Sequence, residues 1–153
     1  MSLTLIAPAG LGPQIDAETL IGITRASHPT SLAPWLRNLV ADPKTISDHY
    51  AAAAFRQRTD PAMRAAQADM ANALFRDGTQ TFDLRPALAR LQVPAQIVWG
   101  RQDRVLPFQQ ALAARGEFGL HLVEGAGHLP HYEVPERIAR IAMRFMAGVE
   151  AST

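Results

Sequence analysis

The sequence contains no cysteine among its 153 residues, which excludes a disulfide framework, a thiolate nucleophile and a cysteine-based zinc site. An excess of charge of either sign is also missing, because 15 Lys and Arg balance 14 Asp and Glu. No Lys/Arg cluster is longer than a pair. The formal net charge of +1 gives no field that would attract nucleic acid or an anionic membrane. We therefore expect neither as a partner.

Long hydrophobic runs are absent as well, and none approaches the length of a membrane span. The opening "MSLTLIAPAGLGP" is apolar, but it lacks a positive n-region and reaches Gly10 and Pro13 too soon for a signal peptide. The composition, with 48% hydrophobic and 19% charged residues, is globular. These features, together with the lack of cysteine, predict a cytoplasmic location.

What is present falls into three parts. Residues 1–13 form a short apolar strand at "SLTLIA" and a turn-rich loop. Residues 14–91 are expected to be all-helical: Asp16 suits an N-cap, "DPKTISDHYAAAAFRQR" and "DPAMRAAQADMANALFRDG" each begin with Asp-Pro, and Gly78 ends the second of these helices.

The third part, residues 92–153, alternates strands and helices. "VPAQIVWG" and "GLHLVEG" are typical of strands, and "FQQALAARG" and "VPERIARIAMRFMAGV" are typical of helices. This order predicts parallel strands joined by right-handed crossovers, so the fold class is α/β.

Two polar side chains follow the two later strands, Asp103 after the first and His128 after the second. Catalytic groups of an open parallel sheet lie outside the carboxyl ends of its strands, so we expect these two residues to meet. A carboxylate beside an imidazole fixes the tautomer of the ring and prepares it to act as a base. Gly125 and Gly127 would let the backbone turn around the histidine.

A metal site is the alternative interpretation of "EGAGHLPHYE", with His128, His131, Glu133 and the nearby His121 as ligands. Leu129-Pro130 separates the two histidines and removes the helix that would aim both rings at one ion, so no metal is predicted. Glu133 is better explained as a residue near a helix start that helps to fix the loop. His131 and Tyr132 could line a pocket or face solvent.

A nucleophile is not apparent. The G-x-S-x-G elbow that accompanies an acid and a histidine in this order does not occur, and there is no P-loop. Ser27 and Ser31 are the serines worth considering, and capping of a helix explains Ser31 better. The remaining serines lie in settings unlike a strand-to-helix elbow, and they are Ser2, Ser47 and Ser152.

The segments "VPAQIVWGRQDRVLP" and "VEGAGHLPHYEVPERIARIAMRFM" resemble the acid-bearing turn and the histidine loop with last helix of the α/β-hydrolase fold. The resemblance places Asp103 and His128 at the acid and base positions of a Ser-His-Asp triad. It implies that the chain is the C-terminal half of this fold, that residues 14–91 are its helical lid, and that residues 92–153 are the C-terminal α/β core.

The opening "SLTLIAPAGLGPQI" and the later "LVADPKTI" are similar to the acyltransferase component of the acetoin dehydrogenase complex. That resemblance implies acetyl transfer from dihydrolipoamide to coenzyme A, with the lipoyl group and CoA as substrates and no cofactor bound by this chain. It also implies a fragment that is inactive without the missing N-terminal half or other complex components. The alternatives are a fragment of a general esterase or C–C hydrolase, and a non-catalytic assembly module whose exposed first strand forms a homo-oligomer.

Overall fold

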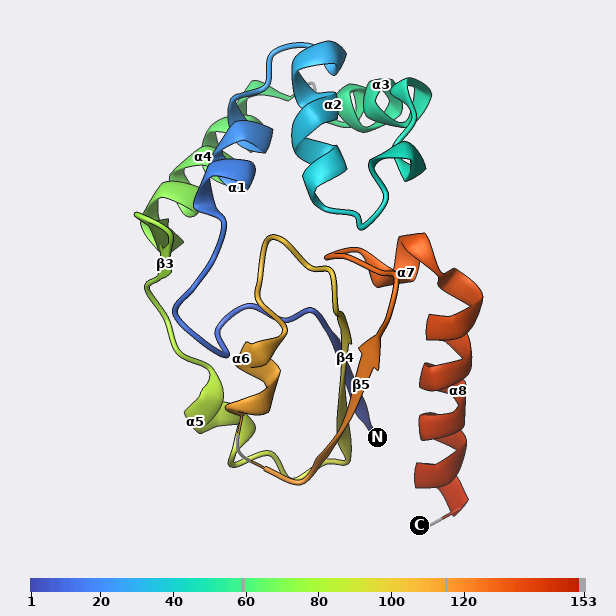
Figure 1. The fold of residues 1–153 in the computed structure, drawn as a ribbon. Coiled ribbons are helices and arrows are strands. Elements are labelled where there is room, and N and C mark those ends of the chain that lie inside the picture. Colours follow the sequence, from blue (N-terminus) through green and yellow to red (C-terminus); the bar gives the residue numbers. More distant parts are fainter. Residues whose placement is uncertain (59, 115, 152–153) are drawn as a thin grey trace.

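The computed structural model describes residues 1–58, 60–114 and 116–151 (Figure 1). Its centre is a three-stranded sheet in the order β1–β4–β5. The strands are β1 (Leu3–Ile6), β4 (Ala95–Gly100) and β5 (Phe118–Val123). Both pairings are parallel, and every residue of the middle strand β4 is buried, as expected for a strand covered on both faces. The predicted α/β arrangement is confirmed.

Different helices cover the two faces of this sheet (Figure 1). Helix α8 (Pro135–Ala151) lies on one face, where Ile138 packs against the buried side chains of Val98 and Val123. Two short helices, α5 (Arg85–Leu88) and α6 (Gln109–Leu112), lie on the other. Arg115, which belongs to the helix predicted over residues 108–116, is outside the described residues.

The longer helices of residues 14–91 gather beyond the carboxyl ends of the strands (Figure 1). They are α1 (Ala17–Arg25), α2 (Pro29–Asn38), α3 (Asp48–Arg56) and α4 (Pro61–Leu74). The Asp16 side chain accepts a hydrogen bond from the backbone N–H of Thr19, and Asp60 accepts one from Ala62, so both predicted N-caps are confirmed.

The helix predicted to start at Asp42 is interrupted. The chain forms a single 3₁₀ turn η1 (Pro43–Thr45), and helix α3 begins only at Asp48. Between them Ile46 is 1% exposed, and Ser47 caps α3 by accepting a hydrogen bond from Tyr50 N–H. Burial of Ile46 and capping by Ser47 therefore outweigh continuation of the helix.

The expectation that residues 14–91 are all-helical is wrong at residues 75–80. Strands β2 (Phe75–Arg76) and β3 (Thr79–Gln80) form a short antiparallel hairpin. Asp77 and Gly78 both have positive φ, 52° and 72°, as a two-residue type I′ turn requires. Gly78 is thus a hairpin residue, and α4 ends earlier, at Leu74.

The hairpin also anchors the loop that follows β1. The amide of the buried Gln80 accepts a hydrogen bond from Gly10 N–H and donates to the carbonyl oxygens of Gly12 and Gln14. Gln110 of α6 donates to the same Gln14 carbonyl. Because the buried amides satisfy the loop's backbone groups, the loop is held against the core.

Among the residues that the structure describes, no helix combines the length and the apolar character needed to cross a membrane.

Candidate active site

The loops after β4 and β5 pack backbone against backbone. Arg101 N–H donates to Val123 O at 3.0 Å, and Gln102 N–H donates to Ala126 O at 2.9 Å. At Gly100, the last residue of β4, an added Cβ would lie 2.0 Å from the Gly127 carbonyl oxygen. Only glycine permits this approach, and it brings the loop of Asp103 against the loop of His128.

Asp103 and His128 meet as the sequence predicted. His128 Nδ1 lies 2.9 Å from Asp103 Oδ2, the Asp103 side chain is fully buried, and the His128 side chain is 21% exposed. A buried carboxylate therefore holds an imidazole that solvent can still reach. Their catalytic role stays a prediction.

The Asp103 carboxylate accepts three further hydrogen bonds. Trp99 Nε1–H donates to Oδ2 at 2.9 Å, and the backbone N–H groups of Val105 and Leu106 donate to Oδ1 at 2.8 and 2.9 Å. These donors stabilise the charged form of the buried carboxylate. An ionised carboxylate can only accept, so His128 Nδ1 must carry the proton of this bond, and in the neutral ring Nε2 keeps a lone pair. The arrangement can therefore accept a proton at Nε2.

The sequence alone did not assign Trp99 to this site. A usable signal exists, because a buried tryptophan needs an acceptor for its N–H, and Asp103 follows it by four residues at the strand end. Trp99 is completely buried and also donates to the Leu106 carbonyl at 3.2 Å.

The loop that carries His128 is shaped by its two glycines. Gly125 has a φ of +79°, in the region that favours glycine. Gly127 needs its missing side chain for space, because a Cβ there would come within 2.8–3.0 Å of backbone atoms of residues 39–41. The N–H of His128 donates to the Leu39 carbonyl at 2.8 Å in this contact.

Glu133 lies in the short helix α7 (Pro130–Glu133), and its carboxylate fixes this loop. Oε1 accepts from Gly127 N–H and Oε2 from Ala41 N–H, each at 2.7 Å. The prediction that Glu133 helps to fix the loop is confirmed, while the partner at residue 41 was not foreseen.

The other residues of the motif do not converge on His128. The Tyr132 ring packs on Tyr50 of α3, with 4.9 Å between ring centroids, and His131 is exposed. Burial, together with the neighbouring Tyr132, raises the pKa of the Tyr50 phenol. His121 lies within β5, opposite Val98.

Within the described residues, no group of three His, Cys, Asp or Glu side chains could hold a metal ion. That a metal is not needed stays a prediction.

In the described part of the chain, no serine makes a hydrogen bond to His128. Ser47 is the N-cap of α3, and Ser31 exchanges hydrogen bonds with the backbone of His28 at the start of α2. Ser152 is outside the described residues. The expectation that Ser31 serves a helix end is confirmed.

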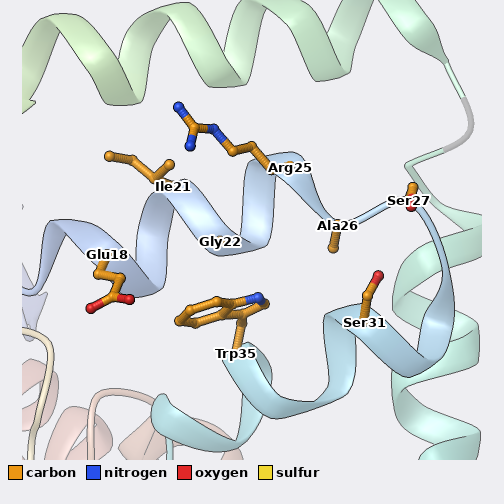
Figure 2. A pocket seen from close by; sticks show the side chains of 8 residues that line it. All are labelled: Glu18, Ile21, Gly22, Arg25, Ala26, Ser27, Ser31 and Trp35. Atoms are coloured by element: carbon orange, nitrogen blue, oxygen red, sulfur yellow. The ribbon is translucent and has the colours of Figure 1, made fainter.

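A pocket of about 340 Å³ lies between α1 and α2 (Figure 2). Its wall includes the Trp35 indole, which lies so close to Gly22 that a Cβ there would be 2.3 Å from the ring. Glu18 lies near one end of the indole and Ser31 near the other (Figure 2). The pocket is lined by the helical segment alone, and neither Asp103 nor His128 contributes to it.

Comparison with known proteins agrees with this architecture. The sequence model of a family described as "Alpha/beta hydrolase family" matches residues 2–141. The chain belongs to the alpha/beta hydrolase family. This confirms the family resemblance that "VPAQIVWGRQDRVLP" and the His128 segment carry.

Two curated relatives of this alpha/beta hydrolase chain share one description, "Dihydrolipoyllysine-residue acetyltransferase component of acetoin cleaving system". The protein from Pseudomonas putida is 31% identical over 95% of this chain and 38% of its own length. The protein from Cupriavidus necator is 24% identical over 97% of this chain and 40% of its own length. The chain thus spans about two fifths of the length of these relatives.

A solved structure gives the same fold. The meta-cleavage product hydrolase from Pseudomonas fluorescens IP01 superimposes with a TM-score of 0.77 at 19% identity, over 95% of this alpha/beta hydrolase chain and 55% of that one. At this identity the likeness establishes the fold, and function has to be argued from the site.

Proposed function

We propose that this chain supplies the acid and the base of a Ser-His-Asp triad in an acyltransferase. The observation that carries the proposal is the bond between buried Asp103 and His128 Nδ1, which leaves Nε2 as the proton acceptor. No G-x-S-x-G motif occurs in the 153 residues, so the serine would come from polypeptide outside them.

The chemistry follows from the free Nε2. The serine oxygen attacks the carbonyl carbon of a thioester while His128 Nε2 accepts the hydroxyl proton. The C–S bond then breaks, and His128 returns the proton to the departing thiol. An acceptor thiol loses its proton to His128 and attacks the acyl-serine, and the ester C–O bond breaks as the serine regains a proton. Asp103 orients the ring and stabilises its charged form throughout.

The substrates are proposed from the two acetoin-system relatives, whose shared description names an acetyltransferase. The acetyl group would pass from dihydrolipoamide to coenzyme A in the cytoplasm, with other complex components as partners. Helices α1–α4, which stand over the carboxyl ends of the strands, would act as a lid and select the acyl group (Figure 1).

A chimera tests this function. The region of the Pseudomonas putida relative that matches this chain is replaced by residues 1–153, and acetyl transfer from S-acetyldihydrolipoamide to CoA is followed. We expect activity in the chimera and a loss of about 10⁶-fold in kcat with His128→Ala, because the base is gone. His131→Ala, an exposed histidine of the same motif, serves as the control and should retain the activity. A chimera that is fully active with His128→Ala would exclude the proposed role of His128.

A general hydrolase is the second candidate, favoured by the family itself and by the likeness to a meta-cleavage product hydrolase. The same chimera separates the two. An acyltransferase forms acetyl-CoA and releases little acetate when CoA is present, whereas a hydrolase releases acetate at the same rate with and without CoA.

A further inference from the structure

The backbone of the proposed base is itself bonded to the helical segment. His128 N–H and Leu129 N–H both donate to the Leu39 carbonyl, at 2.8 and 3.2 Å, and Leu39 is the residue that caps helix α2. The position of the His128 loop therefore depends on where the end of α2 lies.

Glu133 joins the same two segments through its carboxylate. One oxygen accepts from Ala41 N–H, two residues beyond Leu39, and the other accepts from Gly127 N–H, directly before His128. Both distances are 2.7 Å, as expected for hydrogen bonds to a charged acceptor. Two oxygens facing two separate backbone donors suit a carboxylate and not an amide, because an amide would turn an NH₂ group toward one of the N–H groups.

Helix α2 leads from this contact to the pocket between α1 and α2. Trp35 and Ser31 of α2 line that pocket (Figure 2). Residues 39–41 follow the C-terminal end of the same helix. The ten residues of α2 span about 15 Å, and Trp35 precedes Leu39 by about one helical turn, so a shift of Trp35 at the pocket would move residues 39–41 as well.

We propose that Glu133 is a positioning residue that couples the placement of helix α2 to the position of the catalytic base. The carboxylate holds residues 39–41 in a fixed position relative to the loop of His128. A movement of α2 when substrate enters is therefore transmitted to His128. This inference rests on the proposed function, since it takes His128 to be the base.

Amide hydrogen exchange of the 153-residue chain, read by NMR, tests the coupling. We expect Glu133→Ala to speed exchange at Ala41 and Gly127 by about tenfold or more, and at His128 as well, whose N–H bonds to Leu39 and not to Glu133. Glu136→Ala is the matched control, because Glu136 is an exposed carboxylate in the first turn of α8. It should leave all three rates unchanged. Glu133→Gln keeps the size of the side chain and replaces the alanine variant if that variant does not fold.

The chimera supplies the readout that a purely structural role would not move. In the chimera, Glu133→Ala should displace the loop of His128 and lower kcat by about 10- to 100-fold with little change in KM. A misplacement of about 1 Å in a catalytic group costs this much. Unchanged amide exchange at Ala41 and Gly127 in Glu133→Ala would show that Glu133 does not hold these two segments together. Faster exchange at Ala41 and Gly127, with the exchange rate of His128 and kcat unchanged, would overturn the positioning role of Glu133. Full activity with His128→Ala would instead reject the proposed function, so the two failures are distinguishable.

Discussion

Among single residues, Asp103 shows most clearly what the sequence could and could not predict. Its meeting with His128 followed from two facts, that each comes directly after a strand and that parallel strands end at the same edge. Its other partners, the Trp99 ring and two backbone N–H groups, depend on the precise turn after β4. Periodicity does not encode such a turn.

Removal of one of these partners gives a testable change. Trp99→Phe keeps a buried aromatic ring but deletes the N–H that donates to Asp103 Oδ2 and to Leu106 O. We expect a loss of about 1–3 kcal/mol in the free energy of unfolding, because buried acceptors lose their donor. Urea unfolding followed by far-UV circular dichroism measures it.

Trp35→Phe is the control for that substitution. Trp35 is half-buried, and in the described part of the chain its ring N–H makes no hydrogen bond. The same exchange there should cost less than about 1 kcal/mol. Equal losses at both positions would show that ring packing, and not the bond to Asp103, accounts for the effect at Trp99.

Glu133 marks the limit of prediction at the residue scale. Its place near a helix start and its effect on the loop could be inferred, but Ala41 lies 92 residues away in the sequence. A single sequence carries no signal for a contact between a side chain and a backbone N–H over that separation.

At the scale of elements, helices with strong end signals were predicted best. Asp16 and Asp60 cap α1 and α4 where expected. The predictions were wrong at two places where two local signals compete. Ser47 caps α3 after the buried Ile46, so the helix does not run on from Asp42, and Asp77-Gly78 forms a hairpin turn where a helix end was predicted. The Asp-Gly pair is itself a strong hairpin signal, but the helical run before it favoured a helix end.

The contact between α1 and α2 allows a paired test. Gly22→Ala would place a methyl group 2.3 Å from the Trp35 ring, and Gly148→Ala in α8 would meet nothing within 4 Å. Alanine favours a helix over glycine by about 1 kcal/mol, so Gly148→Ala should stabilise by roughly 0.5–1 kcal/mol. At Gly22 overpacking costs about 1–3 kcal/mol and outweighs that gain. Urea midpoints of the two variants should therefore move in opposite directions, and a stabilised Gly22→Ala would contradict the close approach of the two helices.

At the scale of the whole molecule, the site lies where three parts of the chain converge. The loop after β4 supplies Asp103, the loop after β5 supplies His128, and the segment after α2 holds the histidine loop in place. The family and the α/β fold could be inferred from the sequence because residues 92–153 carry dense local signals. How the helical segment joins the core could not, because that contact rests on backbone groups of residues 39–41.

The tautomer of the His128 imidazole is the most direct measurement of the proposed pairing with Asp103. Long-range ¹H–¹⁵N NMR of the 153-residue chain reports which ring nitrogen of the neutral imidazole carries the proton. The bond to Asp103 predicts a single tautomer with the proton on Nδ1 and a bare Nε2. In Asp103→Asn, Oδ1 is still needed by the Val105 and Leu106 N–H groups, and Trp99 Nε1–H keeps the Leu106 carbonyl as its acceptor. The amide NH₂ therefore faces Nδ1, and the proton should move to Nε2. A tautomer mixture in the unmodified chain, unchanged by Asp103→Asn, would contradict the proposed pairing of Asp103 with His128 as acid and base.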